Sequence, residues 1–203
     1  QQTTWTDADV DLTAGHTYTV TAFDANGNRT ASDPVTTAAM ANPNLLAFGS
    51  SWRWYYSAAD PAPGWTADGY DDSTWGTGPG EFGFGEPKGT VITTAAAPRP
   101  LTSYYRTTVT VADPSQFTSI NLDVIRNSGA AVYVNGVEVG RINLPAGTLT
   151  SGTYASAYVA AADRKVPVRI TVPSSAFRAG ANTVAVELHL NSRSQSTAGF
   201  DLK

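Results

Sequence analysis

The side chains best suited to chemistry in this sequence are two histidines and a scatter of carboxylates. Cysteine is absent, which excludes a thiol nucleophile, and His16 and His189 are the only imidazole groups. No Gly-x-Ser-x-Gly elbow, phosphate-binding loop or histidine pair at metal-ligand spacing occurs. Glycoside hydrolysis requires two carboxylates, and the sequence offers Asp71, Asp72, Glu81, Glu86, Glu138 and Glu187.

The adjacent pair Asp71-Asp72 lies in the run Tyr70-Asp-Asp-Ser-Thr-Trp75, which has the composition of a turn. Aspartate in a turn normally accepts hydrogen bonds from nearby backbone N–H groups. We therefore assign these two carboxylates a local structural role, and we expect that the chain is not an enzyme.

Sugar recognition matches the composition better. Carbohydrate sites pair an aromatic ring, which packs on the apolar C–H face of a sugar, with amide, carboxylate or guanidinium groups for the hydroxyls. Sandwich cores use tryptophan heavily, so we expect each tryptophan of the second part of the chain in the core and not in a sugar-binding platform: Trp52, Trp54, Trp65 and Trp75. Alternation along strands and loop context predict that three tyrosines face solvent: Tyr55, Tyr104 and Tyr154.

Polar groups that could complete such a site lie at predicted strand ends, where the loops of a sandwich gather. The ligand-binding set that we predict is Glu86, Lys88, Tyr104, Arg126, Asn127, His189, Asn191 and Arg193. A plainer alternative stays open for its members. His189 could be a half-buried strand residue bonded to a neighbouring carbonyl, and Arg126 could pair with a carboxylate.

Positioning these residues requires strands joined by many turns. Of the 203 residues, 18 are Gly and 12 are Pro, and only 15% are charged. This composition favours short strands over long helices, so the expected fold class is all-β. About nine strands are expected after the first 40 residues, in a jelly-roll β-sandwich. Their ranges are 45–48, 52–56, 104–111, 122–124, 131–134, 137–141, 166–172, 182–190 and 200–202, with a single helical turn at 173–180.

Residues 121–141 carry the clearest local pattern. We predict that their three strands form a β-meander, with a polar turn at 126–129. Asn135-Gly136 is predicted to form the second turn, because a type I′ turn needs positive φ at both central residues. A meander needs a second sheet to cover its apolar face, which is the basis for expecting a sandwich.

A linker of small residues and proline at about 38–44 divides the chain, giving domains over 1–40 and 41–203. Strands are expected at 5–10 and 16–23. The stretch Gly15-His-Thr-Tyr-Thr-Val-Thr-Ala-Phe-Asp-Ala-Asn-Gly-Asn28, followed by Ser32-Asp-Pro-Val35, resembles the last three strands of a fibronectin type III domain. The resemblance implies that Tyr18 is the corner tyrosine of that family.

A second resemblance covers most of residues 45–203. Its motifs are Tyr70-Asp-Asp-Ser-Thr-Trp75, Gly83-Phe-Gly85, Tyr105-Arg106, Gly129-Ala-Ala-Val-Tyr-Val-Asn-Gly136, Gly180-Ala-Asn-Thr-Val-Ala-Val-Glu-Leu-His189 and Phe200-Asp-Leu202. Their order is similar to the galactose-binding-like domains attached to secreted bacterial enzymes. One departure is that Asn127-Ser128 stands where related sequences often have two acidic residues, which weakens a cation or hydroxyl-binding role there.

These resemblances imply a non-catalytic carbohydrate-binding module of a secreted bacterial multidomain enzyme. It would hold the catalytic domain of the same chain near a polysaccharide or oligosaccharide. A structural or protein-interaction domain without a sugar ligand is the alternative. Galactose-binding-like sandwiches often carry a structural calcium ion, for which Asp68, Asp71 and Asp72 could supply oxygen ligands; no other cofactor is expected.

Charge and hydropathy limit the partners. The formal net charge is −4 and basic clusters are few, so nucleic acid is not expected. No apolar run approaches the ~18 residues of a membrane span, so no membrane partner is expected either. The chain opens with Gln1 and shows no signal peptide, from which we expect an internal piece of a longer exported polypeptide.

Overall fold

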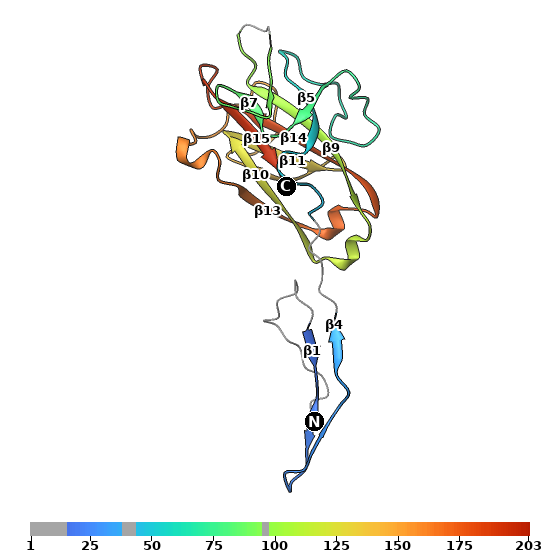
Figure 1. The fold of residues 1–203 in the computed structure, drawn as a ribbon. Coiled ribbons are helices and arrows are strands. Elements are labelled where there is room, and N and C mark those ends of the chain that lie inside the picture. Colours follow the sequence, from blue (N-terminus) through green and yellow to red (C-terminus); the bar gives the residue numbers. More distant parts are fainter. Residues whose placement is uncertain (1–15, 38–43, 95–97) are drawn as a thin grey trace. The chain divides into compact units, whose positions relative to one another are not determined.

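A computed structural model describes residues 16–37, 44–94 and 98–203 (Figure 1). The chain divides into two compact units, residues 1–44 and 45–203, and each is described by itself. The strand expected at 5–10 and most of the predicted linker lie outside the described residues.

The described part of the first unit forms four short strands in two antiparallel pairs. Strand β1 (His16–Tyr18) pairs with β4 (Val35–Thr37), and β2 (Thr21–Phe23) pairs with β3 (Arg29–Ala31). The single strand expected at 16–23 is therefore interrupted. The fibronectin type III assignment stays a prediction.

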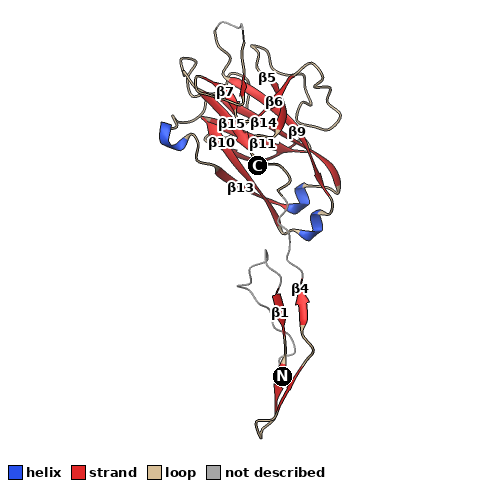
Figure 2. Ribbon diagram, in the orientation of Figure 1, coloured by secondary structure: helices blue, strands red, loops and turns tan. Residues whose placement is uncertain are grey.

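The second unit consists of two sheets (Figure 2). The six-stranded sheet has the order β12-β11-β14-β9-β5-β6, and the five-stranded sheet has the order β13-β10-β15-β7-β8. The bounds are β5 Ser51–Tyr55, β6 Gly76–Pro79, β7 Phe82–Phe84, β8 Thr90–Val91, β9 Thr102–Val111, β10 Ser119–Asn127, β11 Gly129–Val134, β12 Val137–Ile142, β13 Val168–Pro173, β14 Gly180–His189 and β15 Ala198–Leu202. The helical segments of this unit are short 3-10 turns: Pro114–Gln116, Ala161–Asp163 and Ser174–Ala176.

Apolar side chains from both sheets form one core. Tyr105 of β9 stacks on Phe200 of β15 with ring centroids 4.3 Å apart, and Trp52 of β5 meets the same phenylalanine edge-on at 5.3 Å. Both contacts join the two sheets, so the expected all-β sandwich is confirmed. None of the helical segments in the described part of the chain has the length and apolar character needed to span a bilayer.

The predicted β-meander at 121–141 is wrong. Strand β10 pairs with β13 and β15 in one sheet, whereas β11 pairs with β12 and β14 in the other. The polar segment between β10 and β11 therefore carries the chain from one sheet to the other. The error has a simple cause, since the apolar faces of β10 and β11 pack on the same core from opposite sides.

Local turn chemistry was easier to predict. Asn135 and Gly136 have φ values of 51° and 89°, as the expected type I′ turn between β11 and β12 requires. The strand expected at 45–48 is wrong, because these residues form turns and bends, with the Ser50 N–H donating to the carbonyl of Ala47.

Candidate functional site

The outer face of the six-stranded sheet carries an unusual set of polar and aromatic side chains. In a strand, alternate residues point to opposite faces. Val184, Val186 and Leu188 of β14 enter the core, which places Glu187 on the outer face. Glu187 lies directly beside Tyr104 of β9 in the strand register, and Tyr133 of β11 lies diagonally across from it.

A long loop between β5 and β6 covers part of this face with its own rings. Trp65 packs edge-to-face on Tyr104 and on Tyr133, with centroids 5.0 Å and 5.6 Å apart. Trp75, only 6% exposed, packs 5.3 Å from Tyr55. These contacts make a second aromatic layer outside the sandwich core and fix the orientation of each ring.

Between this loop, the sheet and the loop at 149–150 lies a hollow of about 320 Å³. Three rings and two carboxylates provide most of its chemistry. Its lining residues are Asp60, Pro61, Trp65, Thr66, Tyr104, Tyr133, Leu149, Thr150 and Glu187.

Two tyrosine hydroxyls orient the two carboxylates. Tyr104 donates to Oδ1 of Asp60 at 2.7 Å, and Tyr133 donates to Oε1 of Glu187 at 2.5 Å. Burial is the main cause that raises the pKa of both phenols, and the hydrogen bonds to Asp60 and Glu187 raise it further. The phenols therefore stay neutral donors, and the carboxylates keep free lone pairs for a ligand.

His189 lies two residues after Glu187 on the same face of β14, and it is 0% exposed. Its Nδ1 lies 2.9 Å from the carbonyl oxygen of Thr153 and 3.0 Å from Oγ1 of Thr102. A carbonyl only accepts, so Nδ1 carries a proton. Its Nε2 lies 3.1 Å from Oε2 of Glu187, within ion-pair range but not aligned as a hydrogen bond, and has no such partner among the described residues. The plainer alternative for His189, a strand residue bonded to a carbonyl, is what the structure contains.

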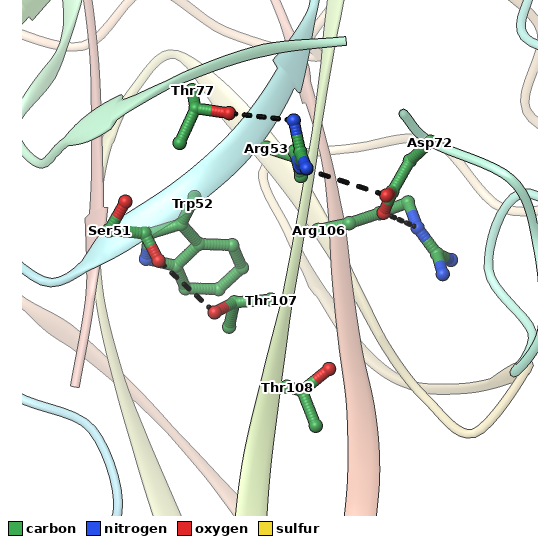
Figure 3. Close-up of a pocket in the computed structure, with 8 residues that line it drawn as sticks. All are labelled: Ser51, Trp52, Arg53, Asp72, Thr77, Arg106, Thr107 and Thr108. Atoms are coloured by element: carbon green, nitrogen blue, oxygen red, sulfur yellow. Dashed lines mark hydrogen bonds and ion pairs between the residues drawn. The ribbon is translucent and has the colours of Figure 1, made fainter. Parts of the chain in front are cut away.

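A second, smaller hollow of about 260 Å³ is lined by Arg106, by other residues of β5, β6 and β9, and by Asp72 (Figure 3). In Figure 3, Asp72 lies between Arg53 and Arg106, and Arg53 also donates to the hydroxyl of Thr77 at 2.9 Å. The charged groups here are partnered with one another. The one tryptophan lining this hollow, Trp52, is 1% exposed, so a sugar ring would find no aromatic face there.

The predicted ligand-binding set does not form one cluster. Tyr104 lines the larger hollow and His189 reaches it only through Glu187. The expectation that Tyr104 faces solvent is wrong, since it is 2% exposed, whereas Tyr154 is 47% exposed as expected. Alternation placed Tyr104 on the correct face, but the loop with Trp65 covers that face.

Glu86 and Lys88 lie beside β7 and β15 of the other sheet. Lys88 Nζ is 2.5 Å from Oε1 of Glu81 and 3.6 Å from Oε2 of Glu86, and its side chain is 2% exposed. Arg164, at 3.7 Å from Glu86, and Lys165, which pairs with Glu81, join the network. Each of the three cations has a carboxylate partner, so the network holds residues 164–165 on the sheet.

Of the remaining predicted residues, Arg126 and Asn127 are the last two of β10, and Asn191 and Arg193 lie in the loop that follows β14. Asn127 donates to Thr197 Oγ1 at 3.0 Å, and the backbone N–H of Asn191 donates to Gln195 at 3.3 Å. Two further members have separate environments. Arg193 donates to the carbonyl of Arg99 at 2.5 Å, and Arg126 has its Nε and Nη1 buried without a hydrogen-bond partner in the described part of the chain. Burial lowers the pKa of Arg126.

The three carboxylates considered for calcium do not fit a calcium site. Asp68 accepts from Thr183 at 2.6 Å and pairs with Arg178, Asp71 accepts from the Ser73 N–H, and Asp72 binds Arg106. Within residues 16–37, 44–94 and 98–203, no group of three or more His, Asp or Glu side chains is placed to hold a metal ion.

Asp60, Trp65, Tyr133 and Glu187 were not predicted as site residues. The sequence does contain a signal for Glu187, because it is a charged residue within the apolar alternation of β14 and must point away from the core. Asp60 and Trp65 carry no such signal, since only the path of their loop brings them to the sheet.

No protein-family model matches the chain, and no curated protein matches it. Solved structures with partial similarity include a β-glucuronidase from glycoside hydrolase family 2 (15% identity, TM-score 0.44, covering 70% of this chain and 13% of that one) and a β-glycosidase from Bacteroides vulgatus (14%, 0.46, 77% and 19%). A β-glucuronidase from Ruminococcus gnavus is similar at 15% identity and a TM-score of 0.45, covering 70% and 21%. The chain spans about a fifth or less of these proteins.

Proposed function

We propose that this chain is a non-catalytic carbohydrate-binding module, with the hollow over β9, β11 and β14 as its sugar site. The observation that carries the proposal is that the half-buried rings of Trp65 and Tyr133 share one hollow with two carboxylates, above the buried ring of Tyr104. An aromatic face binds the C–H surface of a sugar, and carboxylate oxygens accept from its hydroxyls.

The ring of Trp65 and the two carboxylates are held in place without a ligand, which favours affinity. The edge-to-face contacts of Trp65 fix its ring, and the tyrosine hydroxyls fix the carboxylates. A preformed site loses less conformational entropy on binding than one that must be ordered.

We propose further that the module belongs to a secreted bacterial multidomain enzyme and raises the local concentration of a polysaccharide near the catalytic domain. The support is the motif resemblance over residues 45–203 and the likeness of residues 15–35 to fibronectin type III strands. This part of the proposal rests on sequence patterns alone.

A structural or protein-interaction domain is the second candidate. One observation favours it, because the rings of Trp65 and Trp75 also fasten their loop to the sheet, so the aromatic layer could serve stability alone.

Affinity electrophoresis through gels containing a panel of polysaccharides tests the proposal. We expect the wild-type chain to be retarded by at least one polysaccharide, and Trp65→Ala to weaken the affinity about tenfold or more, since losing one ring contact removes on the order of 1–2 kcal/mol. Tyr158→Ala is the matched control, because Tyr158 is 62% exposed and lies outside the hollow. No retardation by any polysaccharide would favour the second candidate. Release of reducing ends that is lost in Asp60→Asn or Glu187→Gln would instead indicate an enzyme.

A further inference from the structure

The charged side chains that line the larger hollow are all acidic. The ionisable side chains that line it are Asp60, Glu187, Tyr104 and Tyr133, and the described lining contains no lysine or arginine. Because burial and their hydrogen bonds raise the pKa of both tyrosines, the phenols stay protonated and add no negative charge of their own. The formal charge of the lining therefore comes from carboxylates.

The nearby arginines already have partners. Arg141 binds both oxygens of Glu138, at 2.5 Å and 2.6 Å, and donates to two carbonyls of the following loop. Arg106 binds Asp72 at 2.8 Å and the carbonyls of Trp65 and Ala67. Neither guanidinium lines the hollow, so neither offers a direct contact to a ligand there.

His189 is the remaining basic side chain near the carboxylates, and its Nε2 lies 3.1 Å from Oε2 of Glu187. It does not line the hollow. The charge of Asp60 has no cationic counterpart among the lining side chains, because Asp60 has only a neutral phenol as its lining partner. The hollow therefore keeps negative character.

The rings add a second attraction for positive charge. A cation within about 6 Å of an aromatic ring is drawn to its negative face, and Trp is the strongest of the three ring types. Trp65, Tyr104 and Tyr133 meet around the same space in which the carboxylate oxygens lie. Rings and carboxylates together form the environment that proteins use to bind ammonium groups.

We propose that the hollow recognises a sugar through a protonated primary amine, so that its ligands are unacetylated amino sugars of a de-N-acetylated polysaccharide. This inference rests on the proposed sugar-binding function and specifies its ligand class. The ammonium group donates to Asp60 and Glu187 and contacts the rings, while the sugar ring packs on Trp65. Glycans rich in carboxylate or sulfate are repelled by the same carboxylates.

Isothermal titration calorimetry with matched oligosaccharides tests this inference. The probes are a glucosamine oligomer, its fully N-acetylated counterpart of the same length, and a uronic acid oligomer, all at one pH and ionic strength. We expect the free-amine oligomer to bind about tenfold or more tightly than the N-acetylated one, the difference that one charge-assisted hydrogen bond can supply. The uronic acid oligomer is expected not to bind.

Charge-neutral variants test whether Asp60 and Glu187 cause the preference for the free-amine oligomer. Asp60→Asn and Glu187→Gln are expected to reduce the preference for the amine, whereas Asp163→Asn, an exposed carboxylate outside the hollow, is expected to keep it. Equal or tighter binding of the N-acetylated oligomer, or an unchanged preference in both hollow variants, overturns the inference while sugar binding itself stands. Binding of no glycan at all overturns both proposals.

Discussion

Nε of Arg106 on β9 lies 2.8 Å from Oδ2 of Asp72, in the loop that carries Trp65. Nη1 of the same guanidinium donates to the carbonyls of Trp65 and Ala67. One buried arginine thus binds the loop at three points, and it sets where Trp65 stands over the sheet. Arg106 is a positioning residue, because it acts on the proposed site only through that loop.

Replacing Arg106 is expected to loosen the loop. Arg106→Met leaves Asp72 and two carbonyls without their donor, so we expect the free energy of unfolding in urea to fall by about 3 kcal/mol. Hydrogen exchange of residues 65–72 should rise at the same time. Arg53→Met is the control, since Arg53 is 42% exposed and 3.8 Å from Asp72, and should cost less than about 1 kcal/mol. Equal losses in the two variants would contradict this role for Arg106.

Gly83 in β7 is expected to tolerate no side chain. Its φ is +150°, and a Cβ there would stand 2.0 Å from the carbonyl oxygen of Ala198 on β15. Gly83→Ala should therefore lower the free energy of unfolding by about 3 kcal/mol or more, from strain and overpacking together. Gly64→Ala is the matched control, with a φ of +86° and nothing within 4 Å, and should cost only about 1–2 kcal/mol. Similar urea midpoints for both variants would refute the clash.

Tyr133→Phe is expected to lower the free energy of unfolding and to weaken the affinity of the proposed site for its ligand. The side chain of Glu187 is only 6% exposed, so losing the phenol donor should cost about 1–3 kcal/mol of stability. A double-mutant cycle with Glu187→Gln isolates the pair, and we expect the two changes together to cost less than their sum. Strict additivity in urea unfolding would mean that the hydrogen bond contributes little.

Asp123 should give the stability a measurable acid dependence. Two hydrogen bonds from Arg169, at 2.7 Å and 2.9 Å, lower the pKa of this carboxyl below its ordinary 3.8. Its stabilising contribution is therefore fully present above that ordinary value and is lost as the pH falls through the lowered pKa. The contribution is expected to be under about 1 kcal/mol, because Arg169 is 58% exposed.

Urea unfolding of wild type and Asp123→Asn as a function of pH measures this contribution. The advantage of the wild type should be constant at neutral pH and vanish in strong acid. Arg169→Met should reduce the same pH dependence by taking away the donor, with Lys203, 3.8 Å from Asp123, as the remaining cation. An advantage that persists unchanged into acid would show that it comes from packing and not from the charge.

Local features of the chain followed from the sequence. Alternation fixed which residues of β5, β9 and β14 enter the core, and the buried position of Trp52 agrees with its expected core role. Trp65 and Trp75 were also expected in the core, but they lie in the aromatic layer outside it. Asn135-Gly136 specified the turn locally, because Asn and Gly adopt positive φ more readily than other residues do. The face on which Tyr104 and Glu187 lie was also decided locally, by the two-residue period of a strand.

Tertiary structure decided the rest. Whether β10 and β11 share a sheet depends on partners far along the chain, β13 and β15 for one and β14 for the other, and no local pattern encodes that choice. In the same way, Tyr104 is buried because a loop some 40 residues earlier folds over it, held by Arg106 and its own tryptophan. The two-residue period of a strand determines the direction of each side chain. Only long-range packing determines which residues that side chain contacts.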